Sequence, residues 1–169
     1  IKINGSDVGI KDLIGKNPVI ILSPEEQCIT KGNPGNRRNY FDKLYSTTSG
    51  NYFKNLSGYF KTLKHRNALL REKRNISDFD PWDETLAELG TKVWNERKDR
   101  NKDFTNCLST VSSSYGDGSI AISLKTEDRG LNKEQTLKMI RGSHQKDLIK
   151  KQTSVGPHRD KINFLFNDK

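Results

Sequence analysis

The sequence has few apolar residues and no long apolar run. Hydrophobic residues make up 31% of the 169 positions, and the mean hydropathy is −0.86. No stretch approaches the roughly 20 apolar residues that a membrane-spanning helix needs, so we expect no membrane contact. No signal peptide pattern opens the sequence. We expect a thin core, part of which a neighbouring domain would cover.

Cysteine is also scarce. The two cysteines, Cys28 and Cys107, lie far apart and form no Cys-x-x-Cys or Cys/His spacing. This excludes the usual structural zinc sites, and we expect no metal. Two reduced thiols are typical of a cytoplasmic protein, which is the location we predict.

Positive charge, in contrast, is abundant. Lysine and arginine number 30 against 21 acidic residues, which gives a net charge of +9 and a pI near 9.5. Such a balance favours an anionic partner, most often nucleic acid. The alternative is a soluble surface that happens to be basic.

The middle of the chain predicts helices. Apolar residues recur at helical spacing over 41–45, 52–70 and 82–111, and a last helix follows over 137–148, with Gly142 as a potential break. Asp80-Pro81 is typical of a helix start, with Asp80 as the N-cap and Pro81 in the first turn. Gly90 could bend the long third helix.

Short apolar runs at 18–24, 120–125 and 162–166 predict strands on both sides of these helices and within them. A helical block between strands indicates an α+β fold.

The segment "GPHRD", Gly156–Asp160, contains the His-Arg-Asp of a kinase catalytic loop. A kinase also needs an asparagine five residues after the aspartate, and Leu165 occupies that position, so we reject this reading. His158 and Asp160 could instead begin a metal site. The interpretation we favour is a Gly-Pro turn with a structural histidine, because no third ligand is evident.

Two segments could contact phosphate. "KGNPGNRR", at 31–38, could bind an anion through backbone N–H groups and two arginines, or could be an ordinary loop that opens a helix. The helix around 52–74 is rich in basic residues with aromatic residues between them. Most of those aromatic residues are expected to belong to the core, and the basic residues could be a solvated face. The residues that we predict to contact DNA are Arg37, Arg38, Lys61, Lys64, Arg66, Arg71 and Arg74.

Four segments together resemble the RecF family of bacterial recombination and gap-repair proteins: "SPEEQCITKGNPGNRRNYFD", "YFKTLKHRNALLRE", "DPWDETLAELG" and "TSVGPHRDKINF". The positions that match the family pattern are Pro24, Glu25, Gly32, Pro34, Arg37, Arg38, Tyr40, Phe41, Asp42, Arg66, Asn67, Leu70, Trp82, Asp83, Gly156, Pro157 and His158. One position departs, because Lys161 follows Asp160 where family members often carry a second aspartate.

The resemblance implies an ABC-type ATPase head related to the SMC proteins. The chain would be mainly the helical lobe, lobe II, at 37–152, flanked at 1–36 and 153–169 by short strands of the nucleotide-binding lobe. Walker A would precede residue 1, and the signature motif and Walker B would follow residue 169. The fragment alone would therefore be no enzyme, while the intact protein would bind ATP and Mg and act as a weak DNA-dependent ATPase.

The resemblance also implies partners and sites. Family members dimerise around ATP, engage DNA at gaps or junctions, and help to load RecA together with RecO and RecR. Gln27, His158, Arg159 and Asp160 would then lie near the lobe interface or the nucleotide. Two alternatives remain open: a stand-alone basic nucleic-acid-binding or scaffold module, and a metal- or phosphate-dependent enzyme built on His158 and Asp160.

Overall fold

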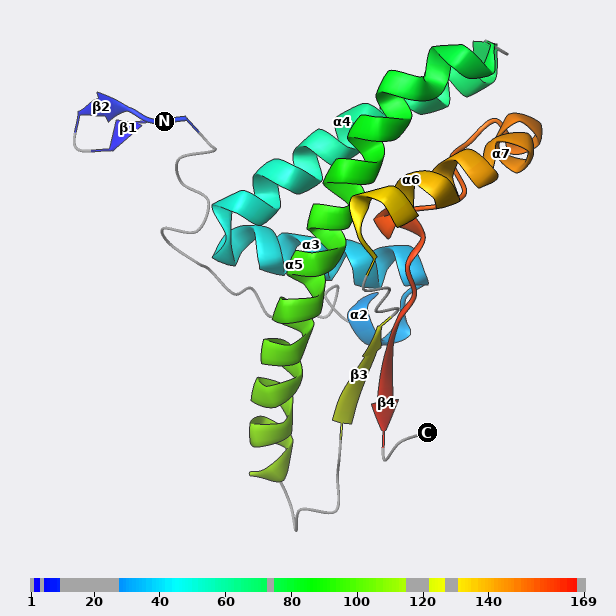
Figure 1. Cartoon of the computed structure of the whole chain (residues 1–169). Helices are drawn as coiled ribbons and strands as arrows, with labels where there is room; N and C mark the ends of the chain where they lie inside the picture. Colours follow the sequence, from blue (N-terminus) through cyan, green and yellow to red (C-terminus); the bar gives the residue numbers. More distant parts are fainter. Residues whose placement is uncertain are drawn as a thin grey trace.

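The computed structural model describes residues 2–3, 5–9, 28–72, 75–114, 122–126 and 131–166. Helices dominate it, and two small antiparallel sheets accompany them (Figure 1). The predicted α+β class, a mainly helical lobe with short strands, is therefore confirmed. The predicted strand at 18–24 and the residues Gln27 and Arg74 lie outside the described residues.

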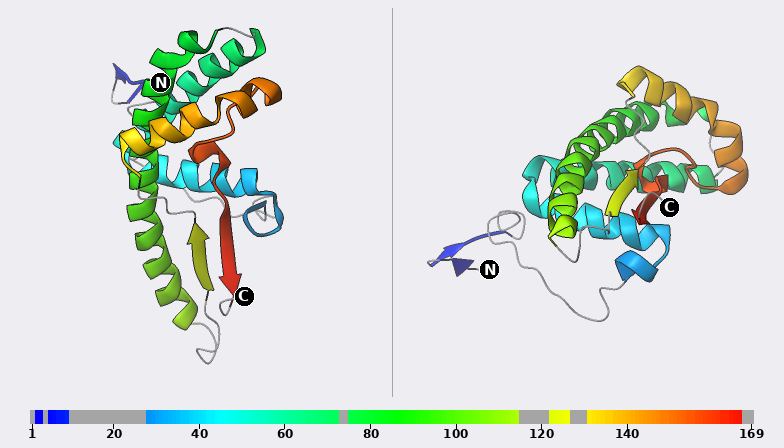
Figure 2. Two further views of the ribbon diagram at one scale, coloured as in Figure 1. Left: turned by 45° about the vertical axis from the view of Figure 1, so that its right-hand side comes forward. Right: turned by 90° about the horizontal axis from the view of Figure 1, so that it is seen from below.

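Two long antiparallel helices form the centre of the lobe. Helix α4 (Gly50–Glu72) packs along the first half of α5 (Asp80–Ser113), and the short 3-10 helix η2 (Ile76–Phe79) precedes α5. Phe79 is the N-cap of α5, so the helix begins one residue before the predicted start. The second half of α5 continues past α4 and runs beside the sheet that contains strand β3 (Ile122–Thr126) (Figures 1 and 2).

The remaining helices surround this pair. Helix α2 (Cys28–Lys31) is followed by α3 (Pro34–Thr48), which packs on α4, while α6 (Lys133–Gly142) packs on α5. Asn33 caps α3, because its side chain accepts the N–H of Asn36 at 3.0 Å. Helix α7 (His144–Lys150) follows α6 after Ser143 alone. The chain thus breaks beside Gly142, the position that the sequence indicated.

Two strand pairs are present. Strands β1 (Lys2–Ile3) and β2 (Ser6–Asp7) form one small antiparallel pair. Strands β3 (Ile122–Thr126) and β4 (Ile162–Phe166) form the other, in which Leu124 is opposite Phe164. The predicted strands at 120–125 and 162–166 are confirmed within two residues. The 3-10 helix η3 (Pro157–Arg159) precedes β4.

Aromatic residues from several elements fill the core. Phe41 is fully buried and contacts Tyr45, Phe104 and Phe164 at ring-centroid distances of 5.0–6.0 Å. This cluster joins α3, α5 and β4, so burial of apolar rings fixes the helices against the sheet.

None of the helices in the described part of the chain is long and apolar enough to cross a membrane.

Gly90 lies in the first half of α5 and is buried. A Cβ atom there would be 3.3 Å from the ring of Tyr59 and 3.5 Å from Pro157. The α5 helix continues without interruption through this position. The glycine therefore allows close packing of α4 and η3 against α5.

Candidate nucleic-acid interface and the buried ionic network

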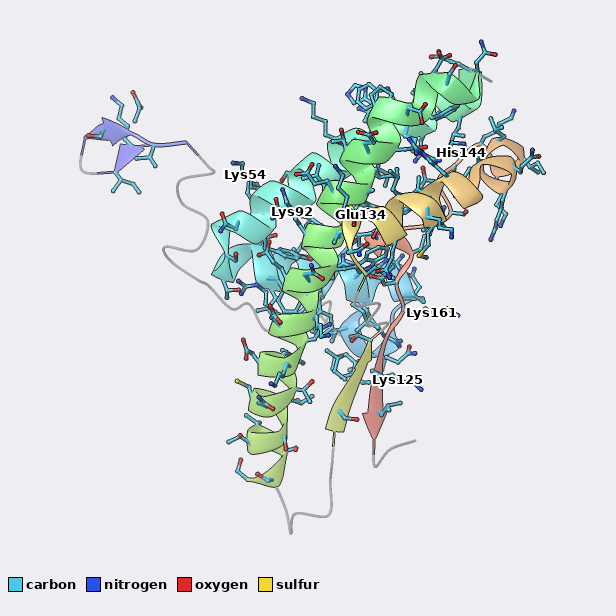
Figure 3. The ribbon with its side chains drawn as sticks, viewed as in Figure 1. Lys54, Lys92, Lys125, Glu134, His144 and Lys161 are labelled. Carbon is cyan, nitrogen blue, oxygen red and sulfur yellow. The ribbon has the colours of Figure 1, made fainter. Side chains whose placement is uncertain are left out.

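The exposed side of α4 carries a stripe of basic side chains. Lys54, Lys61, Lys64 and Arg71 are all exposed, and at about 100° per residue they project within a sector of about 100°. Figure 3 shows Lys54 pointing outward from this helix. No acidic residue occurs between Gly50 and Arg71, and Glu72 ends the helix. We call these four residues the basic stripe; their charged groups could pair with phosphates of a nucleic-acid strand.

Arg66, which the sequence analysis assigned to DNA contact, is not part of the stripe. It follows Lys64 by two residues and therefore points about 200° away around the helix. Its side chain is 0% exposed. The guanidinium pairs with Asp83 through Nε at 2.6 Å and with Asp147 through Nη1 at 2.8 Å. The prediction for Arg66 was wrong, because a buried and paired guanidinium cannot reach a phosphate.

The two carboxylates that hold Arg66 connect further elements. Asp83 on α5 also contacts His144 Nε2 at 2.5 Å, and Figure 3 shows His144 at the start of α7. Asp147 on α7 accepts the N–H of Ser154 at 2.9 Å and the hydroxyl of Ser143 at 2.9 Å. This network joins α4, α5, α7 and the segment before η3 through hydrogen-bonded charges, as buried ions require.

A second ionic centre lies around Arg97 of α5. Its guanidinium pairs with Asp42 of α3 at 2.7 Å and with Asp160 at 3.0 Å, and donates to the carbonyl of Pro157 at 2.8 Å. Burial by itself would lower the pKa of Arg97, but Asp42, Tyr52 and Asp160 outweigh this effect and raise the pKa. Arg97 therefore remains charged and connects α3, α5 and the segment leading to β4.

The turn at Gly156–Asp160 is held by these helices. The hydroxyl of Tyr59 lies 2.6 Å from His158 Nδ1, and His158 Nε2 lies 3.1 Å from the carbonyl of Thr153. Burial lowers the pKa of His158 to about 4, so the ring is neutral at pH 7. Burial also raises the pKa of Tyr59, which keeps its hydroxyl protonated. Tyr59 therefore donates to Nδ1, and Nε2–H donates to the carbonyl of Thr153.

These contacts argue against the alternative that His158 and Asp160 begin a metal site. Both ring nitrogens of His158 are engaged, and Asp160 accepts from Trp94 Nε1 at 2.7 Å and from Arg97. Over the described ranges, no group of three or more His, Cys, Asp or Glu residues could hold a metal ion. The segment forms a hydrogen-bonded turn before β4.

Arg37 and Arg38 connect α3 to neighbouring backbone. Arg37 Nε donates to the carbonyl of Ile29 at 3.1 Å and its Nη1 to that of Ile162 at 3.3 Å. Arg38 Nη1 donates to the carbonyl of Asp160 at 2.7 Å. Both lie in the first turns of α3, so the predicted loop at 31–38 is shorter than expected. They hold α2 and β4, and their contact with DNA stays a prediction.

The ionic partners were the main feature that sequence reasoning missed. Asp42, Asp147 and Thr153 received no role, although all three are buried. A signal was present, because Arg66 stands three residues after Leu63 and four before Leu70, on the apolar side of its helix. Arg97 likewise continues the apolar spacing of α5. A charged residue at a core position requires a buried partner.

Comparisons with known proteins identify the family of the chain. No family model matches the chain. It is 30% identical to the DNA replication and repair protein RecF of Acholeplasma laidlawii over 168 residues, covering 97% of the chain and 47% of the relative. The RecF of Streptococcus uberis is 35% identical over 167 residues, covering 94% of the chain and 46% of the relative.

Two solved structures of the recombination mediator protein RecF in the RecFOR pathway are also similar. The RecF-ATPrS structure matches with a TM-score of 0.88 at 26% identity, and the RecF-ATP structure with 0.88 at 28%. Each match covers 99% of the chain and 48% of the solved chain. The chain thus spans slightly less than half the length of these relatives. On both sequence and fold, the chain belongs to the RecF family.

Proposed function

We propose that the chain is the DNA-contacting helical lobe of a RecF-type repair protein. The intact protein would bind ATP, dimerise around it, and engage DNA at single-strand gaps or junctions in the cytoplasm. It would help to load RecA together with RecO and RecR. The pathway and the ATP forms of the similar solved structures support this proposal.

The nucleotide chemistry would belong to residues outside this sequence. The 169 residues contain no Gly-x4-Gly-Lys-Ser/Thr motif, which is the loop that cradles ATP phosphates in such proteins. Neither ATP nor Mg therefore finds its usual ligands here, and we assign no catalytic residue to this chain. Its contribution would be to bind DNA and to couple that contact to the neighbouring lobe.

We assign the coupling to the turn before β4. Within a division at 1–36, 37–152 and 153–169, this turn would lie where the helical lobe meets the nucleotide-binding lobe. Arg38 and Arg97 hold Asp160 from α3 and α5, so movement of those helices would displace the start of β4. His158 and Arg159 would be close to that interface, and Gln27 is proposed for the same region.

The observation that carries the DNA proposal is the basic stripe on a helix that has no acidic residue before its last position. Phosphate contacts of this kind give binding without sequence preference and a strong dependence on salt. All four residues of the basic stripe are exposed, whereas Arg66 is buried. We retain Lys61, Lys64 and Arg71 as DNA contacts and add Lys54.

The test is the binding of the 169-residue chain to a labelled gapped duplex at several salt concentrations. The double variant Lys64→Glu/Arg71→Glu should weaken binding and reduce the slope of log affinity against log salt by about two. Lys43→Glu/Lys138→Glu makes the same change in net charge on α3 and α6. If both double variants lost the same amount of affinity, net charge alone would explain the effect. The assignment of DNA contact to the basic stripe would then be wrong.

A further inference from the structure

One exposed aromatic side chain lies on the basic side of α4. Phe60 is 42% exposed, whereas Tyr52 and Tyr59 on the same helix are buried at 0% and 1%. The ring of Phe60 contacts that of Tyr59 edge-on, at a centroid distance of 5.7 Å and an interplanar angle of 72°. Tyr59 is in turn held by His158. The inner side of Phe60 therefore rests on a fixed ring, and its outer side meets solvent.

The surroundings of this ring are polar and positively charged. Lys64 follows Phe60 by four residues, so the two side chains are neighbours on the helix surface. Lys61 is adjacent in sequence and exposed, and Ser57, one turn earlier, is also exposed. No acidic residue occurs at positions 50–71. The ring thus lies beside two ammonium groups, and the one carboxylate of its own helix is Glu72, at the last position.

We propose that Phe60 is a stacking platform for an unpaired base, with Lys61 and Lys64 binding the flanking phosphates. The inference rests on the proposed DNA contact and adds the strand type that the stripe prefers. Aromatic rings bind single strands because every base has a π-face, whereas bases within a duplex are already stacked on their neighbours. The basic stripe attracts any nucleic acid, and the ring favours the single-stranded part of a gap.

The experiment compares two DNA substrates with equal numbers of phosphates: a blunt duplex and a shorter duplex with a single-stranded overhang. Each is titrated with the 169-residue chain by fluorescence anisotropy. A 2-aminopurine base in the overhang reports stacking through quenching of its fluorescence. The variants are Phe60→Ala, which removes the ring, and Phe60→Tyr, which keeps it. Val111→Ala, at another exposed apolar position (52%), is the matched control.

We expect Phe60→Ala to weaken binding to the overhang substrate by about 5- to 100-fold. Binding to the blunt duplex should change by less than about twofold, because its phosphate contacts remain. Quenching of 2-aminopurine should be lost in Phe60→Ala and retained in Phe60→Tyr and Val111→Ala. Thermal unfolding of Phe60→Ala establishes that the fold is intact.

Other outcomes would overturn the inference in distinguishable ways. Equal weakening on both substrates, or no weakening, while Lys64→Glu/Arg71→Glu still reduces affinity, would refute the platform and keep the basic stripe. Phe60 would then be a surface residue or a contact for another protein. If the unmodified chain binds neither substrate at low salt, both the platform and the proposed DNA contact are wrong.

Discussion

The hydroxyl of Tyr59 on α4 lies 2.6 Å from His158 Nδ1, although the two residues are 99 positions apart in the chain. This bond connects the middle of the helical lobe to the turn that leads into β4. Tyr59 also packs against Gly90 and faces Gly156, so one side chain contacts both the long helix α5 and the turn.

The first prediction concerns this bond. Tyr59→Phe keeps the ring but leaves Nδ1 of the half-buried His158 without its donor. We expect the free energy of unfolding to fall by about 1–3 kcal/mol, measured by urea denaturation. Tyr40→Phe, at a half-buried ring of α3, is the control and should change stability less. An equal effect of the two substitutions would contradict the assigned hydrogen bond.

The second prediction is a pH dependence of stability. The pKa of His158 is lowered to about 4 in the folded state, mainly by burial and further by Arg159 and Arg38, from an ordinary value of 6.5. Between these values the unfolded chain binds a proton that the folded chain does not. The contribution of this group to the free energy of unfolding is therefore fully present above pH 6.5. It is lost as the pH falls toward 4, by an amount on the order of 3 kcal/mol.

Urea denaturation at pH 7, 6, 5 and 4 measures this effect when the wild-type chain is compared with His158→Gln. The substitution removes the titrating group, so the stability difference between the two proteins should narrow as the pH falls. His65 and His144 are present in both proteins and cancel in the comparison. A difference that stays constant over the whole range would show that His158 titrates normally.

The third prediction concerns Gly156, which has a φ of +137°. A side chain there is strained in itself, and a Cβ atom would lie 2.1 Å from the hydroxyl oxygen of Tyr59. We expect Gly156→Ala to destabilise the protein by about 2–5 kcal/mol. Gly142→Ala is the control, since nothing lies within 4 Å of that position and its φ is not positive. It should be neutral or slightly stabilising in a thermal unfolding experiment.

The turn also shows what the sequence could establish. Gly156-Pro157 predicted a turn before the strand at 162–166, and both are present. Helical spacing predicted the buried sides of α4 and α5, because repeated apolar residues are a local signal. The tautomer of His158 could not be predicted, since it depends on Tyr59 and Thr153, which only the fold brings close.

Charge composition was less reliable than helical geometry at the candidate site. It placed Arg66 with Lys61, Lys64 and Arg71 because all four are basic residues on one helix. The angular positions separate them, and the spacing from Leu63 and Leu70 could have indicated that Arg66 is internal. Its partners Asp83 and Asp147 are distant in sequence, and no periodic pattern identifies such pairs.

The fourth prediction separates the structural arginine from the surface lysines. Arg66→Met leaves Asp83 and Asp147 without their common cation in the interior, so unfolding should become easier by about 3–5 kcal/mol. Lys64→Glu, two residues earlier on the exposed side, should change stability by less than about 0.5 kcal/mol. Urea denaturation measures both values.

For DNA binding we expect the reverse order, with the larger effect in Lys64→Glu and the smaller in Arg66→Met. Lys64→Glu should weaken binding to a gapped duplex, while Arg66→Met, at a temperature where it remains folded, should bind with nearly wild-type affinity and salt dependence. Far-UV circular dichroism establishes that the folded fraction is the same in each titration. Loss of affinity in folded Arg66→Met, with an unchanged Lys64→Glu, would move the DNA contact to the other side of α4 and refute the assignment of the basic stripe.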